Sequence, residues 1–263
     1  MRKRLDQLVC ERGLIESRER AKTMIMAGLV FVDGQRVDKP GAQVAENAAL
    51  ELRGESLPYV SRGGLKLEKA LRVFAVHPAG QICLDCGAST GGFTDVLLQN
   101  GAKKVYAVDV GYGQLAWSLR TDPRVVNLER TNARYLGREQ VPEEIGLAAM
   151  DLSFISLRLV LPAVHALLAE AGDVIALIKP QFEAGREKVG KKGVVRSADT
   201  HLEVLRGLLA AFPTLGFTAA GLDYSPVKGP EGNIEFLCWL KKGIFAAPEL
   251  HPERVVQAAH GEL

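Results

Sequence analysis

The sequence of 263 residues is poor in cysteine, nearly balanced in charge and free of long apolar runs. Of its four cysteines, Cys83 and Cys86 have the spacing of a metal-ligand pair, but they have neither a second pair nor a nearby histidine. A zinc site is therefore not expected, and no metal ligand is assigned. Because nothing suggests a disulfide framework, a reducing cytoplasm fits the cysteine content.

The net charge of +2 does not argue for nucleic-acid binding, so any such site must come from local patches. No apolar run is long enough to span a bilayer. The basic start at residues 1–4 is followed by an amphipathic segment rather than a signal-peptide core. These absences favour a cytoplasmic protein without a membrane segment, and the length allows one large domain plus a small one.

Residues 1–55 have the pattern of a small α+β domain. Apolar spacing predicts short helices over 4–10 and 17–27. Asp33-Gly34 predicts the tight turn of a hairpin over 29–37.

Basic side chains are concentrated near the N-terminus, where seven lysines and arginines stand against four acids in the first 22 residues. Charge alone is equally typical of a solvated helix face. The strings R-L-D at 4–6, S-R at 17–18 and G-x-V-x-V-x-G at 28–34 are more specific, and over about residues 3–50 the chain resembles the ribosomal-protein-S-four-like RNA-binding domain. In that family, paired helices present basic side chains to structured RNA. The resemblance implies an RNA partner and four contact residues: Arg4, Arg18, Arg20 and Lys22.

Strand and helix patterns alternate from residue 64 to residue 243, after a predicted linker over 56–63. The alternation predicts an α/β fold in which a mainly parallel sheet is covered by helices on both faces. In such sheets, ligands bind beyond the carboxyl ends of the strands, where the strand order reverses. Residues 244–263 are expected to form a tail, and no role is assigned to it.

A glycine-rich turn over 85–94, D-C-G-A-S-T-G-G-F-T, follows the first predicted strand of this domain. Its glycines let the backbone approach a ligand closely, and the helix that begins there supplies free N–H groups. A dinucleotide fingerprint would be G-x-G-x-x-G, but Ser89 stands at the middle glycine. Asp85, the first residue of this string, is a poor neighbour for a pyrophosphate and a good one for a sulfonium-bearing amino acid.

A second acid, Asp109, ends the next predicted strand about twenty residues later, where a ribose-binding carboxylate belongs. The two acids and the turn resemble the S-adenosylmethionine site of a Rossmann-like methyltransferase more than an NAD site. Asn132 follows a further strand, where its side chain could reach the adenine. The candidate cofactor residues are Asp85, Gly87, Ser89, Thr90, Gly91, Gly92, Phe93, Thr94, Asp109 and Asn132.

Four charged residues stand beside apolar ones where a strand or helix should be buried: Lys66, Asp151, Lys179 and Glu235. Charged side chains are rarely buried without a paired or catalytic reason. If the four converge, they form a site that can deprotonate a ribose 2′-hydroxyl. Lys179 would then act as the base with Lys66 as a second cation, and the two carboxylates would orient the lysines and the hydroxyl. The alternative is that each residue makes an unrelated buried ion pair.

This lysine–aspartate–lysine–glutamate set on a Rossmann-like core resembles the FtsJ-type 2′-O-methyltransferases. With the S-four-like domain in front, residues 3–242 resemble the TlyA family, also called hemolysin A-like. The matching strings are S-R-G-G-L-K at 61–66, the turn at 85–94, M-D-L-S-F-I-S at 150–156, I-K-P-Q-F-E at 178–183 and G-P-x-G-N-I-E-F at 229–236. The resemblance implies a seven-stranded class I methyltransferase domain. It also implies 2′-O-methylation of a cytidine in ribosomal RNA of the large subunit, and in some members of the small one.

A basic, glycine-rich segment over 185–196 directly follows the string that contains Lys179. We interpret it as a mobile flap over the RNA and the methyl donor, the alternative being a disordered solvent loop. Its candidate phosphate contacts are Lys188, Lys191, Lys192 and Arg196.

Three other functions compete with this interpretation. A cytolysin, which the name hemolysin suggests, would need a secretion signal, a pore-forming amphipathic repeat or a membrane span. A non-catalytic RNA-binding or ribosome assembly factor would not need an intact donor turn and an intact set of four charged residues. Base methylation normally uses Asn-Pro-Pro-aromatic or a catalytic cysteine, and D-L-S-F at 151–154 is neither. The target nucleotide, the assembly state of the substrate and the oligomeric state of the protein stay open.

Overall fold

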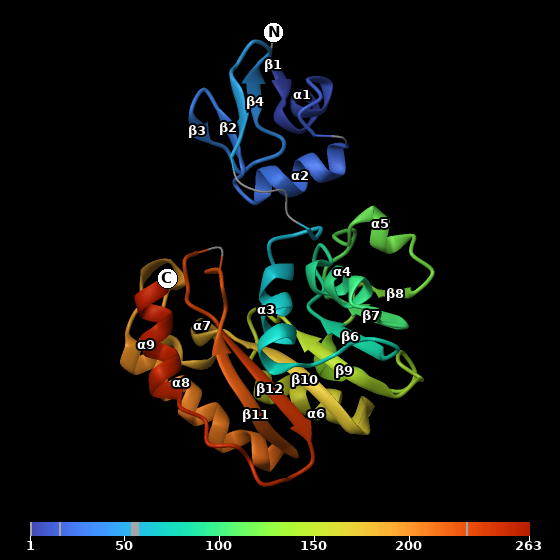
Figure 1. The fold of residues 1–263 in the computed structure, drawn as a ribbon, viewed down its shortest axis with the longest axis vertical. Helices are drawn as coiled ribbons and strands as arrows, with labels where there is room; N and C mark the ends of the chain where they lie inside the picture. The colour runs from blue at the N-terminus through green and yellow to red at the C-terminus, as the bar shows by residue number, and fades with distance from the viewer. Residues whose placement is uncertain (1, 16, 54–57, 230) are drawn as a thin grey trace.

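The computed structural model describes residues 2–15, 17–53, 58–229 and 231–263, which form a small N-terminal unit and a larger α/β unit (Figure 1). In the small unit the apolar faces of two helices pack against a hairpin, with Leu5, Ile25 and Val30 fully buried. The two predicted helices and the hairpin turn at Asp33-Gly34 are confirmed. The elements are β1 (Arg2–Arg4), α1 (Leu5–Glu11), α2 (Arg18–Met26), β2 (Val30–Val32), β3 (Gln35–Arg36), β4 (Gln43–Ala45) and β5 (Leu50–Leu52).

The large unit contains a seven-stranded sheet with the order β11-β12-β10-β9-β6-β7-β8, as predicted for a mainly parallel α/β domain. Neighbouring strands run parallel except for β12, which lies antiparallel to both β10 and β11. The chain leaves β6 toward β7 on one side and returns to β9 on the other, so strand order reverses at β6. The strands are β6 (Ile82–Cys86), β7 (Lys104–Val108), β8 (Val125–Leu128), β9 (Ile145–Met150), β10 (Leu168–Ile178), β11 (Phe217–Tyr224) and β12 (Phe236–Lys242).

Two apolar cores cover the two faces of this sheet, because successive strand residues point to opposite sides. Cys83 packs in the core under α3, α4 and α5, whereas Cys86 packs in the core under α6, α8 and α9. The two cysteines therefore do not form a ligand pair. The helices are α3 (Gly64–Phe74), α4 (Gly92–Gln99), α5 (Trp117–Arg120), α6 (Leu157–Leu167), α7 (Pro180–Glu183), α8 (Ala198–Ala211) and α9 (Pro252–Glu262), with short 3₁₀ turns η1 (Ala133–Tyr135), η2 (Arg186–Lys188), η3 (Lys191–Gly193) and η4 (Phe212–Leu215).

Both segments that flank the predicted methyltransferase domain pack against it. Residues 56 and 57 of the predicted linker lie outside the described residues, but Tyr59 is buried in the same core as α3. At the other end, α9 lies beside α8 and buries Val256 and Ala259 (Figure 1). The predicted tail therefore contains a helix that completes one face of the domain. Across the described ranges, no helix is long and apolar enough to cross a membrane.

Candidate active site

The four charged residues singled out in the sequence come from four elements that meet at one edge of the sheet. Lys66 lies in the first turn of α3, Asp151 follows β9, and Lys179 follows β10. Glu235 precedes β12 instead of following it. Because β12 is antiparallel to β10, its first residue lies beside the last residue of β10, which brings Glu235 to the same edge.

The structure brings these four side chains together in one chain of ion pairs. Lys66 Nζ lies 2.6 Å from Glu235 Oε2 and 3.6 Å from Asp151 Oδ2. Lys179 Nζ lies 2.5 Å from Asp151 Oδ1 and donates to Ser153 Oγ at 3.2 Å. Glu235 is 1% exposed and both lysines are below 10%, whereas the Asp151 side chain is 19% exposed and faces the cavities beside it. Asp151 bridges the two lysines.

The charges of neighbouring side chains keep Lys66 and Asp151 ionised. Burial by itself lowers the pKa of Lys66, but Asp151 and Glu235 outweigh it and raise that pKa above its ordinary value. Burial raises the pKa of Asp151, but Lys66 and Lys179 outweigh it and hold that pKa below its ordinary value. Lys66 is therefore a fixed cation between two carboxylates, whereas Lys179 contacts one carboxylate and a hydroxyl.

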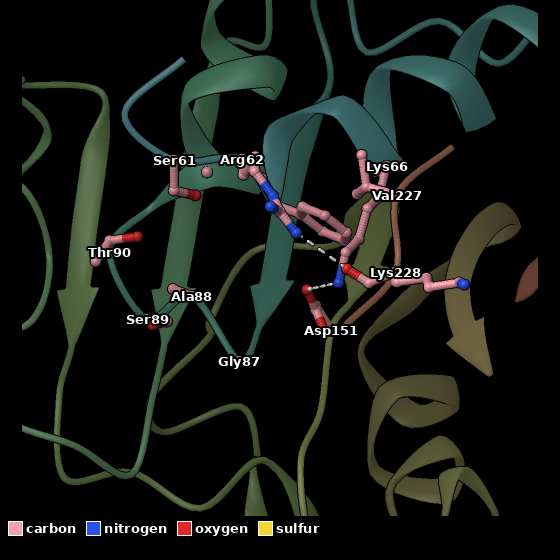
Figure 2. A pocket seen from close by; sticks show the side chains of 13 residues that line it. Ser61, Arg62, Lys66, Gly87, Ala88, Ser89, Thr90, Asp151, Val227 and Lys228 are labelled. Atoms are coloured by element: carbon pink, nitrogen blue, oxygen red, sulfur yellow. Dashed lines mark hydrogen bonds and ion pairs between the residues drawn. The ribbon is translucent and has the colours of Figure 1, made fainter. Parts of the chain in front are cut away.

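Two cavities open beside the ion pairs, on either side of the glycine turn. The first, of about 200 Å³, lies between Ser61–Gly63 and the turn, with Lys66 and Asp151 at its side (Figure 2). The second, of about 480 Å³, is bounded by Asp109, Asn132 and residues 152–155. Gly87, Ser89 and Asp151 line both cavities, so the two form one cleft across the turn.

Glycine is required at two positions of the turn. At Gly87, φ is +89° and a Cβ atom would lie 2.4 Å from the carbonyl oxygen of Asp151. At Gly92, a Cβ atom would lie 2.9 Å from the backbone nitrogen of Gly64 and 2.2 Å from Ser61 Oγ. The turn therefore presses closely on Asp151 on one side and on the segment before Lys66 on the other.

The predicted cofactor residues divide into those that line the cleft and those that support it. Asp109 accepts hydrogen bonds from the N–H groups of Ser89, at 2.8 Å, and Gly111, at 2.7 Å, and so fixes the turn. The lining residues are Gly87, Ser89, Thr90, Gly92, Phe93, Asp109 and Asn132. Among the described residues, Asp85, Gly91 and Thr94 line neither cavity. Gly91 faces Leu115 and Leu119 instead.

Asp85 is fully buried at the end of β6, beneath the turn. Its Oδ2 accepts a hydrogen bond from Thr94 Oγ1 at 2.7 Å, and its Oδ1 has no hydrogen-bond partner among the residues described. Burial raises the pKa of Asp85 to about 7. A buried carboxylate with one unused oxygen fits a cationic ligand group above the turn, and the fit favours a sulfonium or ammonium compound over a pyrophosphate.

The raised pKa of Asp85 predicts a pH-dependent instability of the free protein. A group whose folded pKa is raised contributes stability below its unfolded pKa, near 3.8, and loses it as the pH rises toward 7. Asp85→Asn removes this loss, so its free energy of unfolding should rise relative to that of the wild type by up to about 3 kcal/mol between pH 5 and pH 8. Denaturant unfolding of both proteins across this range measures the difference. A constant difference would contradict the assignment.

The predicted RNA contacts lie in two places. Arg4 and Arg18 both pair with the fully buried Asp6, at 3.0 and 3.2 Å, and stay half exposed. Lys22 is exposed on α2, but Arg20 borders a cavity between α2 and residues 58–60 of the large unit. The structure therefore places Arg4 and Arg18 together, and it does not gather all four residues into one cluster.

The basic segment over 185–196 carries its predicted contacts around a hollow of about 490 Å³, lined by Lys188, Lys191, Lys192 and Arg196. Lys188 also pairs with Glu203 of α8. The segment is attached at its end, where Val194 and Val195 are buried. Its cations therefore extend from an anchored loop.

Several residues of the cleft are not among the site residues predicted from the sequence. Ser61 and Arg62 line the first cavity, where Arg62 Nη2 donates to the carbonyl oxygen of Lys228 at 3.1 Å (Figure 2). Ser153 contacts Lys179. Their positions in the sequence could have indicated them, because each lies in the same short string as one of the four charged residues.

Comparisons with known proteins agree on the organisation of the chain. The family described as FtsJ-like methyltransferase matches residues 59–242, and the S4 domain matches residues 3–50. The chain is 51% identical to YqxC of Bacillus subtilis, covering 100% of this chain and 95% of the relative. It is 47% identical to the 16S/23S rRNA (cytidine-2′-O)-methyltransferase TlyA of Mycobacterium tuberculosis, covering 91% and 90%. A solved structure named a hemolysin from Streptococcus thermophilus is 50% identical, with a TM-score of 0.79 over 99% of this chain and 96% of that chain.

Proposed function

Because the chain belongs to the FtsJ-like methyltransferases, in the TlyA family with an N-terminal S4 domain, we propose that it methylates a cytidine ribose of ribosomal RNA at the 2′-oxygen. S-adenosylmethionine is the proposed methyl donor. The observation that carries the proposal is the buried chain Glu235–Lys66–Asp151–Lys179 beside the glycine turn. The M. tuberculosis relative is named for activity on both 16S and 23S rRNA, so both ribosomal subunits are candidate substrates for this chain.

Lys179 is the proposed proton acceptor for the ribose hydroxyl. A lysine held by two carboxylates gives up its proton less readily than one held by a single carboxylate, and Lys66 is the lysine with two. Lys66 would therefore hold Asp151 in place as a permanent cation, and Asp151 would orient Lys179. Ser153 Oγ, 3.2 Å from Lys179 Nζ, would help to orient the amine of Lys179, which accepts the hydroxyl proton only in its neutral form. Positioning of the hydroxyl supplies much of the rate enhancement.

The donor would lie in the cleft across the glycine turn. When bound, S-adenosylmethionine supplies an electrophilic methyl group on a sulfonium. Asp109 and Asn132 line the second cavity and would contact the nucleoside part, while Gly87 allows close approach of the backbone. Asp85 would stabilise the positive charge from beneath the turn.

With ribosomal RNA as its partner, the protein would act in the cytoplasm. Half-exposed Arg4 and Arg18 on the S4 domain would bind the RNA by phosphate contacts. Lys188, Lys191, Lys192 and Arg196 would bind it next to the catalytic edge.

The test is transfer of tritiated methyl from S-adenosylmethionine to unmodified ribosomal subunits, followed by mapping of the labelled atom. Label at a ribose 2′-oxygen supports the proposal and leaves the nucleotide to be mapped. If the protein binds the donor but labels neither subunit, the non-catalytic assembly factor becomes the better description.

Neutralising the basic loop should weaken RNA binding in a salt-dependent way. In a variant with Lys188, Lys191 and Lys192 changed to alanine, the slope of log affinity against log salt should fall by roughly 0.7–0.9 for each phosphate that the variant no longer binds. Filter binding of ribosomal RNA from about 50 to 200 mM salt measures the slope. Lys103→Ala, which removes an exposed lysine just before β7, is the matched control and should leave the slope unchanged. Identical slopes for all three proteins would remove the loop from the RNA-binding surface.

A further inference from the structure

Asn233 has a position that the proposed chemistry does not explain. It is 2% exposed and lies two residues before Glu235, at the entrance to β12. Its side-chain hydrogen bonds go to the basic loop, where Oδ1 accepts from Val195 N at 2.9 Å and Nδ2 donates to Gly193 O at 2.9 Å. Both ends of one buried amide are therefore used to hold the loop.

The backbone around Asn233 is equally constrained. The carbonyl oxygen of Asn233 accepts from Gly229 N at 2.9 Å, and that of Glu235 accepts from Ser225 N at 2.8 Å. A Cβ atom at Gly229 would lie 2.5 Å from Glu235 Oε1, so Gly229 packs directly on the carboxylate. A displacement of Asn233 therefore displaces Glu235, the partner of Lys66.

His201 holds the same loop residue from the other side. It is fully buried on α8, with Nε2 3.2 Å from Val195 O and Nδ1 2.9 Å from His260 Nε2 of α9. The arrangement that satisfies both contacts has His201 Nε2–H donating to Val195 O, and His260 donating to His201 Nδ1. The His201 ring also packs edge-on against Phe236, at 5.4 Å between centroids. Val195 is thus fixed at its N–H by Asn233 and at its carbonyl by His201.

We propose that Asn233 and His201 are positioning residues that tie the RNA-contacting basic loop to the strand end bearing Glu235, so that RNA docking and alignment of the ion-pair chain are coupled. The inference rests on the proposed function, which supplies both the RNA contact and the catalytic role. Without this anchor, the loop must be ordered when RNA binds, and the ordering reduces affinity. The C-terminal helix α9 takes part through His260.

The experiment measures RNA binding without donor, and then kcat and KM for RNA, in Asn233→Ala. We expect RNA affinity to fall about tenfold, within the range of coupling between sites, and kcat to fall as well. Tryptic cleavage after Lys191 and Lys192 should become faster while donor affinity is retained. His201→Ala should reproduce the weaker RNA binding, whereas His201→Gln, which keeps a donor near Val195 O, should recover most of the affinity.

A double-mutant cycle separates an anchor from a general fall in stability. If Asn233 acts through the loop, Asn233→Ala should have little further effect on RNA affinity once Lys191 and Lys192 are alanine. Thr218→Ala is the matched control, because Thr218 Oγ1 is also buried, donates to Gly243 O at 2.8 Å and accepts from Phe245 N at 2.9 Å, at the opposite edge of the sheet. It should lower the melting temperature without changing RNA affinity.

Additive effects in the cycle, or an equal fall in RNA affinity in Thr218→Ala, would overturn the anchor. Failure of the proposed function gives a different result. In that case the wild type transfers no methyl group, while RNA binding and proteolysis still report whether Asn233 holds the loop.

Discussion

Lys179→Ala is expected to lower the rate of methyl transfer to ribosomal RNA by about 10²–10⁴-fold, the usual contribution of a positioned proton acceptor. Asp151 keeps Lys66 as its cation in this variant, so the fold should survive. Lys66→Ala is a poorer test, because it leaves the buried carboxylate of Glu235 without its ion-pair partner. Breaking a buried ion pair in this way costs about 3–5 kcal/mol. Single-turnover transfer of tritiated methyl measures the rate.

Lys241→Ala is the control for this variant. Lys241 Nζ pairs with Asp173 Oδ1 at 3.1 Å, which places another lysine–aspartate pair on β12 and β10 but away from the catalytic edge. It should transfer methyl groups at the wild-type rate. A Lys179→Ala rate within about tenfold of the wild type would assign the proton to another acceptor.

Gly87→Ala is expected to weaken S-adenosylmethionine binding about 100-fold and to reduce methyl transfer with it. The new Cβ would stand 2.4 Å from the carbonyl oxygen of Asp151, so the turn or the end of β9 must move. Overpacking costs about 1–3 kcal/mol and a left-handed alanine about 1–2 kcal/mol, together on the order of 3 kcal/mol. Calorimetric titration of the donor measures the change in affinity.

Gly80→Ala separates the clash from the backbone strain. Gly80 has φ +74°, close to the +89° of Gly87, but no atom lies within 4 Å of its Cβ position among the residues described. This variant should lose some stability and keep its donor affinity. Equal donor affinities for the two variants would show that contact with Asp151 does not matter.

The sequence predicts secondary structure well where residues close together in the chain determine it. Apolar spacing predicts the helices over 4–10 and 17–27, which form as α1 and α2, and Asp33-Gly34 predicts the hairpin between β2 and β3. The pairing of β1 with β4 escaped prediction, because β1 consists of three charged residues with no alternating pattern. The helix α9 escaped for a different reason, since its fit against α8 depends on residues about fifty positions earlier.

The four residues proposed to be catalytic could be singled out from the sequence alone, since a charged side chain in an apolar string is visible there. The sequence does not say which lysine contacts which acid. Lys66 and Glu235 lie 169 residues apart, and only the order of the strands in the sheet brings them together. The burial of Asp85 beneath the turn, the bridge that Asp151 forms between both lysines and the hold of Asn233 on the basic loop all had to come from the folded chain. Composition and spacing are local properties, whereas burial and the partner of a charge are set by whichever distant strand the fold places beside it.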